Sequence, residues 1–485
     1  MNRLSATCLY ISNLKTSRTR TLALVLSAVF IGGCATFSED GGFGGVETMT
    51  RERLDKKVKW VRNERDAEQV QATVKKLLAA PLSVDSAVQI ALLNNRGLQA
   101  TYAELGIAEA DLVQAGRLRN PGFSFARLTR GDDIDIERTF LFDVLGLITL
   151  PIRTELERRR FELTKLRVTA DTLQVAADTR RAFFSAVAAQ EAVKYMDQVK
   201  LAAEASAELA RRMAAAGNFS KLDQSREQVF YAEVTAHLAR VKQTALAERE
   251  RLTRLMGLWG EDIRFSLPER LPDLPKTARE ISDLEQQALK QRLDVQGAMK
   301  EAENIAASLG LTRATGFLNV LEVGYQRNSE SGKPIQTGYE IELRLPIFDW
   351  GGARVARAEF TYMQAVNRAA DIAVKARSEV REAYGAYRTA FDLARHYRDE
   401  IVPLRKRISE ENLLRYNGML ISVFELLADA RQQIASVNRY IEELRDYWIA
   451  ESSLTLALTG QSPGAISTGG GGMQGVAGGA EQPGH

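Results

Sequence analysis

The chain has 485 residues, 45% hydrophobic and 26% charged, enough to bury a large core. Its formal charge of +3 arises in residues 1–33, which hold four basic and no acidic residues; 65 less these four leaves 61 basic against 62 acidic residues. A near-neutral chain without a basic block gives no electrostatic reason to bind nucleic acid, and two cysteines with three scattered histidines offer no disulfide framework or metal-ligand spacing. We therefore expect no metal and no cofactor, and an enzyme is disfavoured.

The N-terminus predicts a secretion signal followed by a lipid anchor. A basic stretch precedes an apolar run of about twelve residues, Thr21 to Gly32, which is shorter than the roughly 20 residues of a membrane-spanning helix. The run ends in Gly32-Gly33-Cys34, which resembles the bacterial lipoprotein signal, where the cysteine is diacylated; an ordinary signal peptide with a chance cysteine is the alternative. We expect removal of residues 1–33, lipidation at Cys34 and, because Ala35 follows instead of aspartate, an outer-membrane address.

The body of the chain contains an internal sequence repeat of two copies. Four landmarks recur with offsets of 197, 195, 201 and 203 residues: Ala91-Leu92-Leu93 as Ala288-Leu289-Lys290, Leu150-Pro151-Ile152 as Leu345-Pro346-Ile347, Gly217 as Gly418, and Leu255-Met256-Gly257 as Leu458-Thr459-Gly460. Such constant spacing indicates an internal repeat. It divides the chain into a signal (1–33), an N-terminal segment (34–80), repeat 1 (81–266), a proline-rich linker (267–280), repeat 2 (281–460) and a glycine-rich tail expected to be disordered (461–485).

Each repeat predicts the same elements: a helix, two strands, a long helix, a glycine turn and a returning helix. For repeat 1 the expected bounds are 83–118, 123–127, 134–144, 153–216 and 221–258, and for repeat 2 they are 282–311, 317–326, 339–345, 353–416 and 423–458. Helices of some 64 residues would reach about 95 Å and pack as coiled-coil hairpins. Pro403 should kink its helix.

The last predicted strand alternates most clearly. Tyr339, Ile341 and Leu343 share one face, and Glu340, Glu342 and Arg344 share the other. In a soluble sheet the apolar face would cover a core, whereas in a barrel it would meet lipid while the charged face lines a wet lumen. Four strands cannot close a barrel, and open edges are not tolerated in lipid, so spanning strands would require several copies. Three copies would supply twelve strands.

This layout resembles the TolC family of outer-membrane efflux channels over roughly residues 80–460. The resemblance rests on the LSVDSAVQIALLNN start at Leu82, on Asn120-Pro121 before the first strand, on Pro346-Ile347-Phe348-Asp349-Trp350-Gly351-Gly352 after the last, and on the duplicated order. It implies a mainly helical protomer with a β-barrel part, assembled as a homotrimer with a twelve-stranded barrel and a long coiled-coil tunnel in the periplasm. It also implies a periplasmic adaptor and an inner-membrane pump as partners.

Three groups of residues are candidates for function. By resemblance, the two turns are adaptor-docking tips, although they could be simple helix caps: Gly217, Asn218, Phe219, Ser220, Gly418, Met419, Leu420, Ile421 and Ser422. Carboxylates at i,i+4 beyond each tip could form an entrance ring that attracts cations, or a solvated helix face: Asp223, Glu227, Glu425 and Asp429. The barrel lumen would hold Glu340, Glu342 and Arg344.

Two alternative interpretations of the sequence remain open. A lipid-anchored periplasmic adaptor would show one hairpin interrupting a lipoyl-like β domain, and a tethered structural coiled coil would leave the strands unexplained. The sequence favours a passive exit duct of a tripartite efflux system that is not an enzyme. The sequence does not distinguish among metal ions, drugs and other small molecules as the exported substrate.

Overall fold

The computed structural model describes residues 36–315, 320–343 and 346–464, which form two compact units. The sheet unit comprises Met1–Gly44, Ala103–Lys165 and Gly297–Ala369, and the helical unit comprises Gly45–Tyr102, Leu166–Gln296 and Ala370–His485. Each unit therefore takes residues from both halves of the chain. None of the helices in the described ranges is long and apolar enough to cross a membrane.

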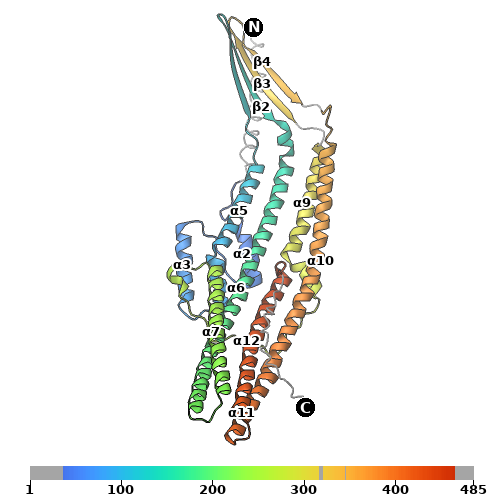
Figure 1. Ribbon diagram of the computed structural model, residues 1–485. Coiled ribbons are helices and arrows are strands. Elements are labelled where there is room, and N and C mark those ends of the chain that lie inside the picture. Colours follow the sequence, from blue (N-terminus) through green and yellow to red (C-terminus); the bar gives the residue numbers. More distant parts are fainter. Residues whose placement is uncertain (1–35, 316–319, 344–345, 465–485) are drawn as a thin grey trace, which may run out of the picture. The chain divides into compact units, whose positions relative to one another are not determined.

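One antiparallel sheet of four strands dominates the sheet unit (Figure 1). Its strands, in spatial order, are β1 (Gly122–Arg130), β2 (Asp133–Asp143), β3 (Leu321–Glu330) and β4 (Gln336–Leu343). Both hairpins predicted from the sequence are present, and β2 pairs with β3 to join them. The outer strands β1 and β4 have neighbours on one side only among the described residues.

The strand bounds differ from the predicted ones. β1 is longer than expected at both ends, because its pairing with β2 runs without interruption from Gly122↔Leu141 to Arg130↔Asp133. β3 is shifted towards the C-terminus, and β4 begins three residues earlier, since Asn328↔Gln336 still pairs beside the turn. Residues 317–319 and 344–345, which the predicted strands included, lie outside the described ranges.

The first long helix begins earlier than the sequence suggested. α6 spans Val144–Ala215, so it starts directly after β2 and contains Pro151. Asp143 acts as the N-cap of α6, because its Oδ1 accepts a hydrogen bond from the Gly146 backbone amide at 2.6 Å. A Cβ at Gly146 would lie 2.2 Å from Asp143 Oδ2, so a larger residue there would displace the capping carboxylate.

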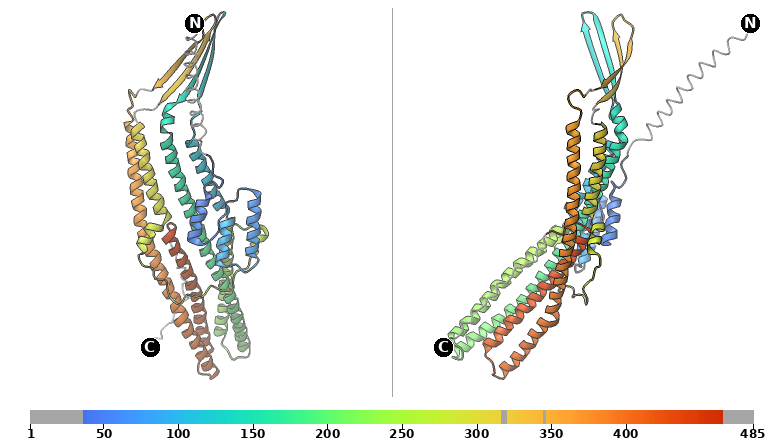
Figure 2. Two further views of the ribbon diagram at one scale, coloured as in Figure 1. Left: turned by 180° about the vertical axis from the view of Figure 1, so that it is seen from behind. Right: turned by 90° about the vertical axis from the view of Figure 1, so that its right-hand side faces the viewer.

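The remaining helices mostly belong to the helical unit. They are α2 (Phe43–Leu54), α3 (Glu64–Leu78), α4 (Val84–Asn94), α5 (Arg96–Ala115), α7 (Lys221–Met256), α8 (Leu284–Gln291), α9 (Leu293–Thr315), α10 (Gly352–His396), α11 (Val402–Asn417) and α12 (Val423–Thr459), with a short 3-10 turn at Gly260–Ile263. The chain turns back at residues 216–220 and 418–422, so α6 pairs with α7 and α11 with α12 as hairpins (Figure 2).

Each predicted first helix is broken in two. The helix breaks at Asn95, where two side chains contact the end of α7. Asn94 Nδ2 donates to the Gly257 carbonyl at 2.8 Å, and Asn95 Nδ2 donates to the Leu255 carbonyl at 2.7 Å. Gly257 is left-handed (φ 65°), and a Cβ there would lie 2.5 Å from the Asn94 carbonyl oxygen. The paired asparagines of the sequence motif thus cap the returning helix.

The second copy makes the same joint with different chemistry. The break falls at Arg292, and the Leu293 amide donates to the Gly460 carbonyl at 2.9 Å. Arg292 is only 1% exposed and forms ion pairs with Asp294 at 2.6 Å and Glu379 at 2.8 Å. A buried arginine with two carboxylates therefore occupies the place of Asn95.

A single turn of π-helix, Tyr397–Ile401, separates α10 from α11. Its last bond runs from the Val402 amide to the Tyr397 carbonyl, one residue further back than in an α-helix. Pro403 follows and has no amide hydrogen to continue the regular pattern. The irregularity predicted at Pro403 is therefore taken up by the turn before it.

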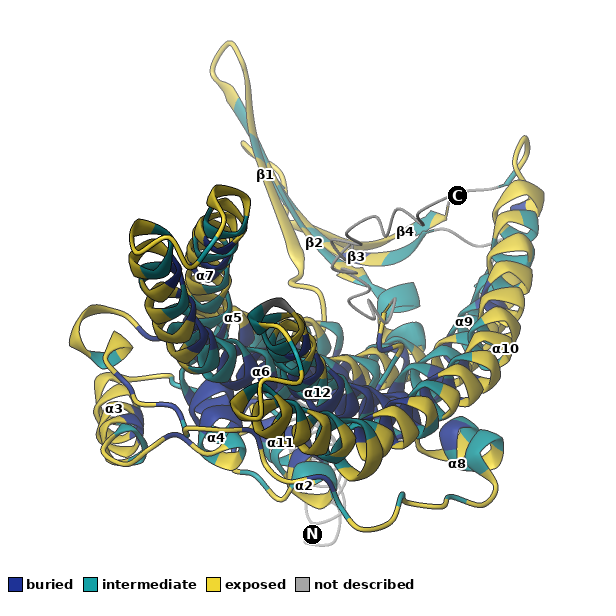
Figure 3. Cartoon of the chain, turned by 60° about the horizontal axis from the view of Figure 1, so that its bottom comes forward, coloured by how far each residue is buried: buried dark blue, intermediate teal, exposed yellow. Residues whose placement is uncertain are grey.

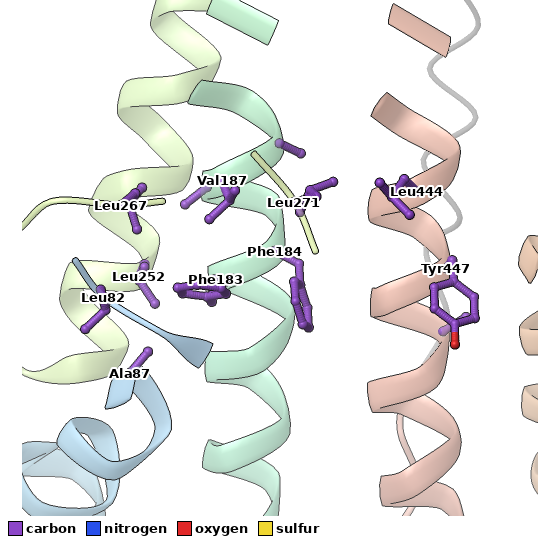
Figure 4. Close-up of a cluster of buried hydrophobic side chains, with 14 of the residues drawn as sticks. Leu82, Ala87, Phe183, Phe184, Val187, Leu252, Leu267, Leu271, Leu444 and Tyr447 are labelled. Carbon is purple, nitrogen blue, oxygen red and sulfur yellow. The ribbon is translucent and has the colours of Figure 1, made fainter. Parts of the chain in front are cut away.

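The main core lies in the helical unit and draws on both repeats (Figure 4). Phe183, Phe184 and Val187 of α6 pack with Leu252 of α7, with Leu267 and Leu271 of the linker, and with Leu444 and Tyr447 of α12. α11 contrasts with these helices, because it contains no buried residue (Figure 3). The linker is thus a structural strap that helps to bury the core.

Candidate functional site

The first hairpin turn ends α6 with a glycine. Gly217 is left-handed (φ 80°), its amide donates to the Ala214 carbonyl, and the Asn218 amide donates to the Met213 carbonyl at 2.9 Å. These two bonds define a Schellman motif. Nothing lies within 4 Å of the place a Gly217 Cβ would take, so only the backbone conformation requires glycine. Asn218 and Ser220 are exposed, whereas Phe219 is half-buried.

The second turn uses the same motif one residue later than the sequence suggested. The Met419 amide donates to the Tyr416 carbonyl and the Leu420 amide donates to the Arg415 carbonyl, which places Met419, not Gly418, in the left-handed region (φ 59°). Gly418 has φ −81° and needs no special conformation. Met419 is 93% exposed and Leu420 is 77% exposed, so this turn presents two large apolar side chains to solvent.

The carboxylates of the first predicted pair have different surroundings. Asp223 belongs to the N-cap of α7: its amide donates to the Ser220 hydroxyl oxygen at 3.1 Å, and that hydroxyl donates to Asp223 Oδ2 at 2.6 Å. Glu227 is 2% exposed, accepts a hydrogen bond from the Ser206 hydroxyl at 2.9 Å, and lies 3.7 Å from Arg431 of α12. One of the pair is a cap and the other links the two hairpins.

The second pair divides in the same way. Glu425 is exposed, and its amide donates to the N-cap Ser422 at 3.3 Å. Asp429 is 8% exposed, and its Oδ2 has no hydrogen-bond partner among the described residues. In the part of the chain that the structure describes, no group of three or more His, Cys, Asp or Glu is arranged to hold a metal ion.

The sheet has two chemically different faces. Register places Phe123, Phe140, Tyr325 and Tyr339 in one row across the strands, and Phe125, Phe142 and Ile341 share their face. These apolar side chains are exposed or half-buried within the protomer, with Tyr339 at 83% and Phe123 at 58% exposed. Of the residues in the four strands, only Gly324 is buried, so neither face is covered by a core.

The opposite face is polar and acidic. Asp143, Glu322 and Glu342 are paired in register across three strands, and Gln326 donates to Glu340 at 2.6 Å beside them. Sequence reasoning identified Glu340 and Glu342 but missed Asp143 and Glu322, which only the strand register brings into one row. Arg119 lies 3.4 Å from Asp143 and gives the row a cationic neighbour. Arg344 lies outside the described residues.

The predicted lipidation site, Cys34, also lies outside the described residues. The chain that follows it is held in the sheet unit by Glu109 of α5, which is 6% exposed. Glu109 Oε1 accepts hydrogen bonds from both the amide (2.7 Å) and the hydroxyl (2.5 Å) of Ser38. A charge-assisted pair of this kind fixes the position of Ser38.

Comparison with known proteins identifies a similar architecture. No protein-family model matches the chain. The cobalt-zinc-cadmium resistance protein CzcC of Cupriavidus metallidurans is 25% identical over 282 residues, which are 56% of this chain and 64% of that protein. The match thus spans less than two thirds of that relative.

Solved structures extend the likeness over more of the chain. The CmeC outer membrane channel of Campylobacter jejuni has a TM-score of 0.68 at 16% identity, covering 86% of this chain and 92% of that one. A structure of CusC gives 0.65 at 17%, covering 78% and 92%, and the open state of the MtrE outer membrane channel of Neisseria gonorrhoeae gives 0.64 at 16%, covering 78% and 89%. The resemblance drawn from the sequence is confirmed at the level of fold: the chain has the mainly helical fold, with its small antiparallel sheet, of the TolC-family outer-membrane channels.

Proposed function

We propose that this protein is the outer-membrane exit duct of a tripartite efflux system and acts as a homotrimer. The observation that carries the proposal is the sheet, whose aromatic face is left uncovered by the protomer while its other face is acidic. An uncovered aromatic face suits contact with lipid, and an acidic face suits a wet lumen. Open strand edges are not tolerated in a bilayer, and β1 and β4 supply such edges, so three copies would close a twelve-stranded barrel.

The same proposal gives the helical hairpins a role in the periplasm. They would form the tunnel that receives cargo from an inner-membrane pump through a periplasmic adaptor. An adaptor identity for this chain is disfavoured, because the four described strands form one sheet built equally from both halves of the chain. The duct itself performs no chemistry and conducts what the pump delivers, whether metal ions, drugs or other small molecules.

The lipid anchor is part of the proposal, with Cys34 as the acylated residue and the outer membrane as the location. Cys34 lies four positions before Ser38, a span of about 14 Å when extended. Glu109, which holds Ser38, lies about 9 Å along α5 from its end at Ala115. The tether is therefore long enough to reach the level at which α5 ends before β1.

We assign adaptor docking to the two tips, and chiefly to Met419 and Leu420, because their exposed apolar side chains suit a helical partner. The other tip residues shape the two turns: Gly217, Asn218, Phe219 and Ser220 in the first, and Gly418, Ile421 and Ser422 in the second. Replacing Met419 and Leu420 by aspartate should abolish cross-linking to the adaptor in cells while the protein still assembles. Aspartate at Leu413, which is exposed on α11 away from the turn, is the control. Undiminished cross-linking of the tip variant would refute the assignment.

The acidic entrance is proposed for the less buried member of each carboxylate pair: Glu425 is exposed and Asp223 is half-buried. Glu425, with Asp223, would attract cations at the tip end of the tunnel, whereas Glu227 and Asp429 are too buried in the protomer to meet them unless the hairpins separate. Divalent-cation block of single-channel current should weaken in Glu425→Gln. Block that is unchanged in Glu425→Gln combined with Asp429→Asn would end the entrance proposal.

A further inference from the structure

Helix α10 has two apolar faces, of which the described protomer covers one. On the covered face Ala365 is buried, and beside it Glu359 pairs with Arg313 of the neighbouring α9 at 2.6 Å (Figure 1). The outer face recurs at alternating steps of four and three residues and consists of Ala356, Phe360, Met363, Asn367, Ala370 and Val374. This spacing is that of a coiled-coil seam. Phe360 is 76% exposed, and Met363 and Val374 are exposed as well, so the outer face has no partner among the described residues.

The outer face is a stripe with a polar border. Arg357, Thr361, Gln364 and Arg368 follow one edge of it, and all four are exposed. A helix surrounded by lipid would be apolar all round, and a helix that faces water would be polar on its outer side. An apolar stripe between polar groups therefore suits a second helix of similar pattern.

A matching face lies on α5. Ala103 and Ile107 are four positions apart and both are exposed, with Ile107 at 65%. They lie on the side of α5 away from Leu105 and Glu109, which are buried. α5 thus also presents apolar side chains that no described residue of its own protomer covers.

The order of the elements brings these two helices together between copies. α5 precedes β1 and α10 follows β4, and β1 and β4 are the outer strands of the described sheet. All neighbouring strands of that sheet are antiparallel, so β4 of one copy beside β1 of the next would continue the pattern. Because α5 leads to the sheet and α10 leads away from it, the two helices would then run side by side and antiparallel.

The positions of the exposed side chains along the helices agree with this pairing. Ile107 lies eight positions before the end of α5 at Ala115, and Phe360 lies eight positions after the start of α10 at Gly352. Each is therefore about 12 Å from the sheet end of its helix. The two largest exposed apolar side chains in this part of α5 and α10 would meet at the same level.

The charges beside the two faces are complementary. Asp111 lies four positions from the end of α5, and Arg357 lies five positions from the start of α10, so they are nearly level. Both are exposed. An acidic and a basic side chain at the border of one helix pair favour this register and this choice of partner.

We propose that α10 packs against α5 of the partner subunit as an antiparallel coiled coil. Phe360 contacts Ile107 of the partner subunit, and Arg357 pairs with Asp111 of the partner subunit. Each protomer offers α10 to one neighbour and α5 to the other, so the contact is head-to-tail and closes a ring. The inference rests on the proposed duct and adds the helix faces that join its copies below the sheet.

The test is cross-linking of the full-length protein in membranes with a short bis-maleimide. The chain has only two cysteines, Cys8 in the predicted signal and Cys34 at the proposed lipidation site, so introduced thiols are the reactive ones. Phe360→Cys combined with Ile107→Cys should yield covalent dimers and trimers on a denaturing gel. Each single variant should remain a monomer, because the link needs one thiol from each of two helices.

A matched control lies on the same face of α10. Val374 is exposed but lies about 21 Å further along the helix than Phe360, so Val374→Cys combined with Ile107→Cys should remain a monomer. Met363→Cys combined with Ala103→Cys, eleven and twelve positions from the same helix ends, is a second pair that should cross-link even if the loss of Phe360 disturbs folding.

Native mass spectrometry of each variant before the reaction separates the possible failures. Trimers in which neither predicted pair cross-links, or in which the Val374 pair cross-links equally well, would refute the contact between α10 and α5 and leave the duct intact. Monomers of the unaltered protein would refute the duct and the contact with it. A cross-link from Phe360→Cys alone to a different protein would assign the outer face of α10 to that protein and overturn the inference.

Discussion

Met419 shows how a single residue can depart from the pattern that surrounds it. A side chain in the left-handed region costs about 1–2 kcal/mol relative to the right-handed region, a cost that glycine avoids. Gly418 is the neighbouring residue, yet the hydrogen bonds of the turn put Met419 at the left-handed position. A strained, 93% exposed methionine at the tip of a hairpin is a feature that stability does not explain.

Replacing Met419 by glycine should therefore stabilise the turn by about 1 kcal/mol. Amide hydrogen exchange at Leu420, whose amide closes the turn, should slow by several fold. The global melting temperature is not the measurement to use, because the hairpin tip opens locally. Gly418→Ala is the comparison and should change exchange little, as its φ of −81° suits alanine. Faster exchange in the Met419 variant would contradict the assigned turn.

Arg292 is a residue whose loss should affect the whole helical unit. Its guanidinium is 1% exposed between Asp294 and Glu379, so Arg292→Met leaves two carboxylates facing an apolar group. Removing one partner of a buried ion pair costs about 3–5 kcal/mol. Urea unfolding should show that loss, whereas Arg377→Met, an exposed arginine 3.8 Å from Glu285, should cost less than about 1 kcal/mol. Equal stability of the two variants would mean that Arg292 is not buried in solution.

Among the elements, the sequence predicts existence and order better than bounds. The hydrophobic periods and the repeated landmarks predicted all four strands and both helical hairpins, because these patterns reflect local burial. The breaks at Asn95 and Arg292 could not be predicted, since they depend on partners about 160 residues away at Leu255 and Gly257 and at Gly460. The early start of α6 depends on one hydrogen bond, from the Gly146 amide to the Asp143 side chain. A hydrophobic period in the sequence does not predict such a bond.

The candidate residues follow the same rule. Spacing placed Asp223 with Glu227 and Glu425 with Asp429 on common helix faces, but burial separates the members of each pair, and burial depends on the neighbouring hairpin. Alternation in one strand identified Glu340 and Glu342. The acidic row that includes Asp143 and Glu322 required the register of three strands, because a shift of one residue would send these side chains to the other face.

The acidic row leads to a prediction for the sheet as an element. Aligned carboxylates from each protomer would concentrate cations at one end of the proposed lumen. Glu322→Gln combined with Glu342→Gln should lower the cation-over-anion permeability ratio in planar bilayers by several fold, with unchanged assembly. Glu137→Gln, near the middle of β2 and six residues before Asp143, is the control for position along the strand. A ratio that does not change would show that this face does not line the current path.

At the scale of the whole molecule, the features agree on an assembly that one protomer does not complete. Among the described residues, the sheet has two open edges and an uncovered aromatic face. α11 contains no buried residue, and the tip of its hairpin exposes Met419 and Leu420. Each of these would be costly in an isolated chain, and each finds a partner in the proposed trimer with its lipid and its adaptor. The central claim is therefore the trimeric, lipid-anchored duct.

Native mass spectrometry of the unboiled complex, extracted from membranes with detergent, tests that claim most directly. The account predicts a mass of three subunits, each beginning at Cys34 and carrying a diacylglyceryl group and an acyl chain. A water-soluble monomer without lipid would contradict both the closed barrel and the anchor, and would favour a tethered or adaptor role instead.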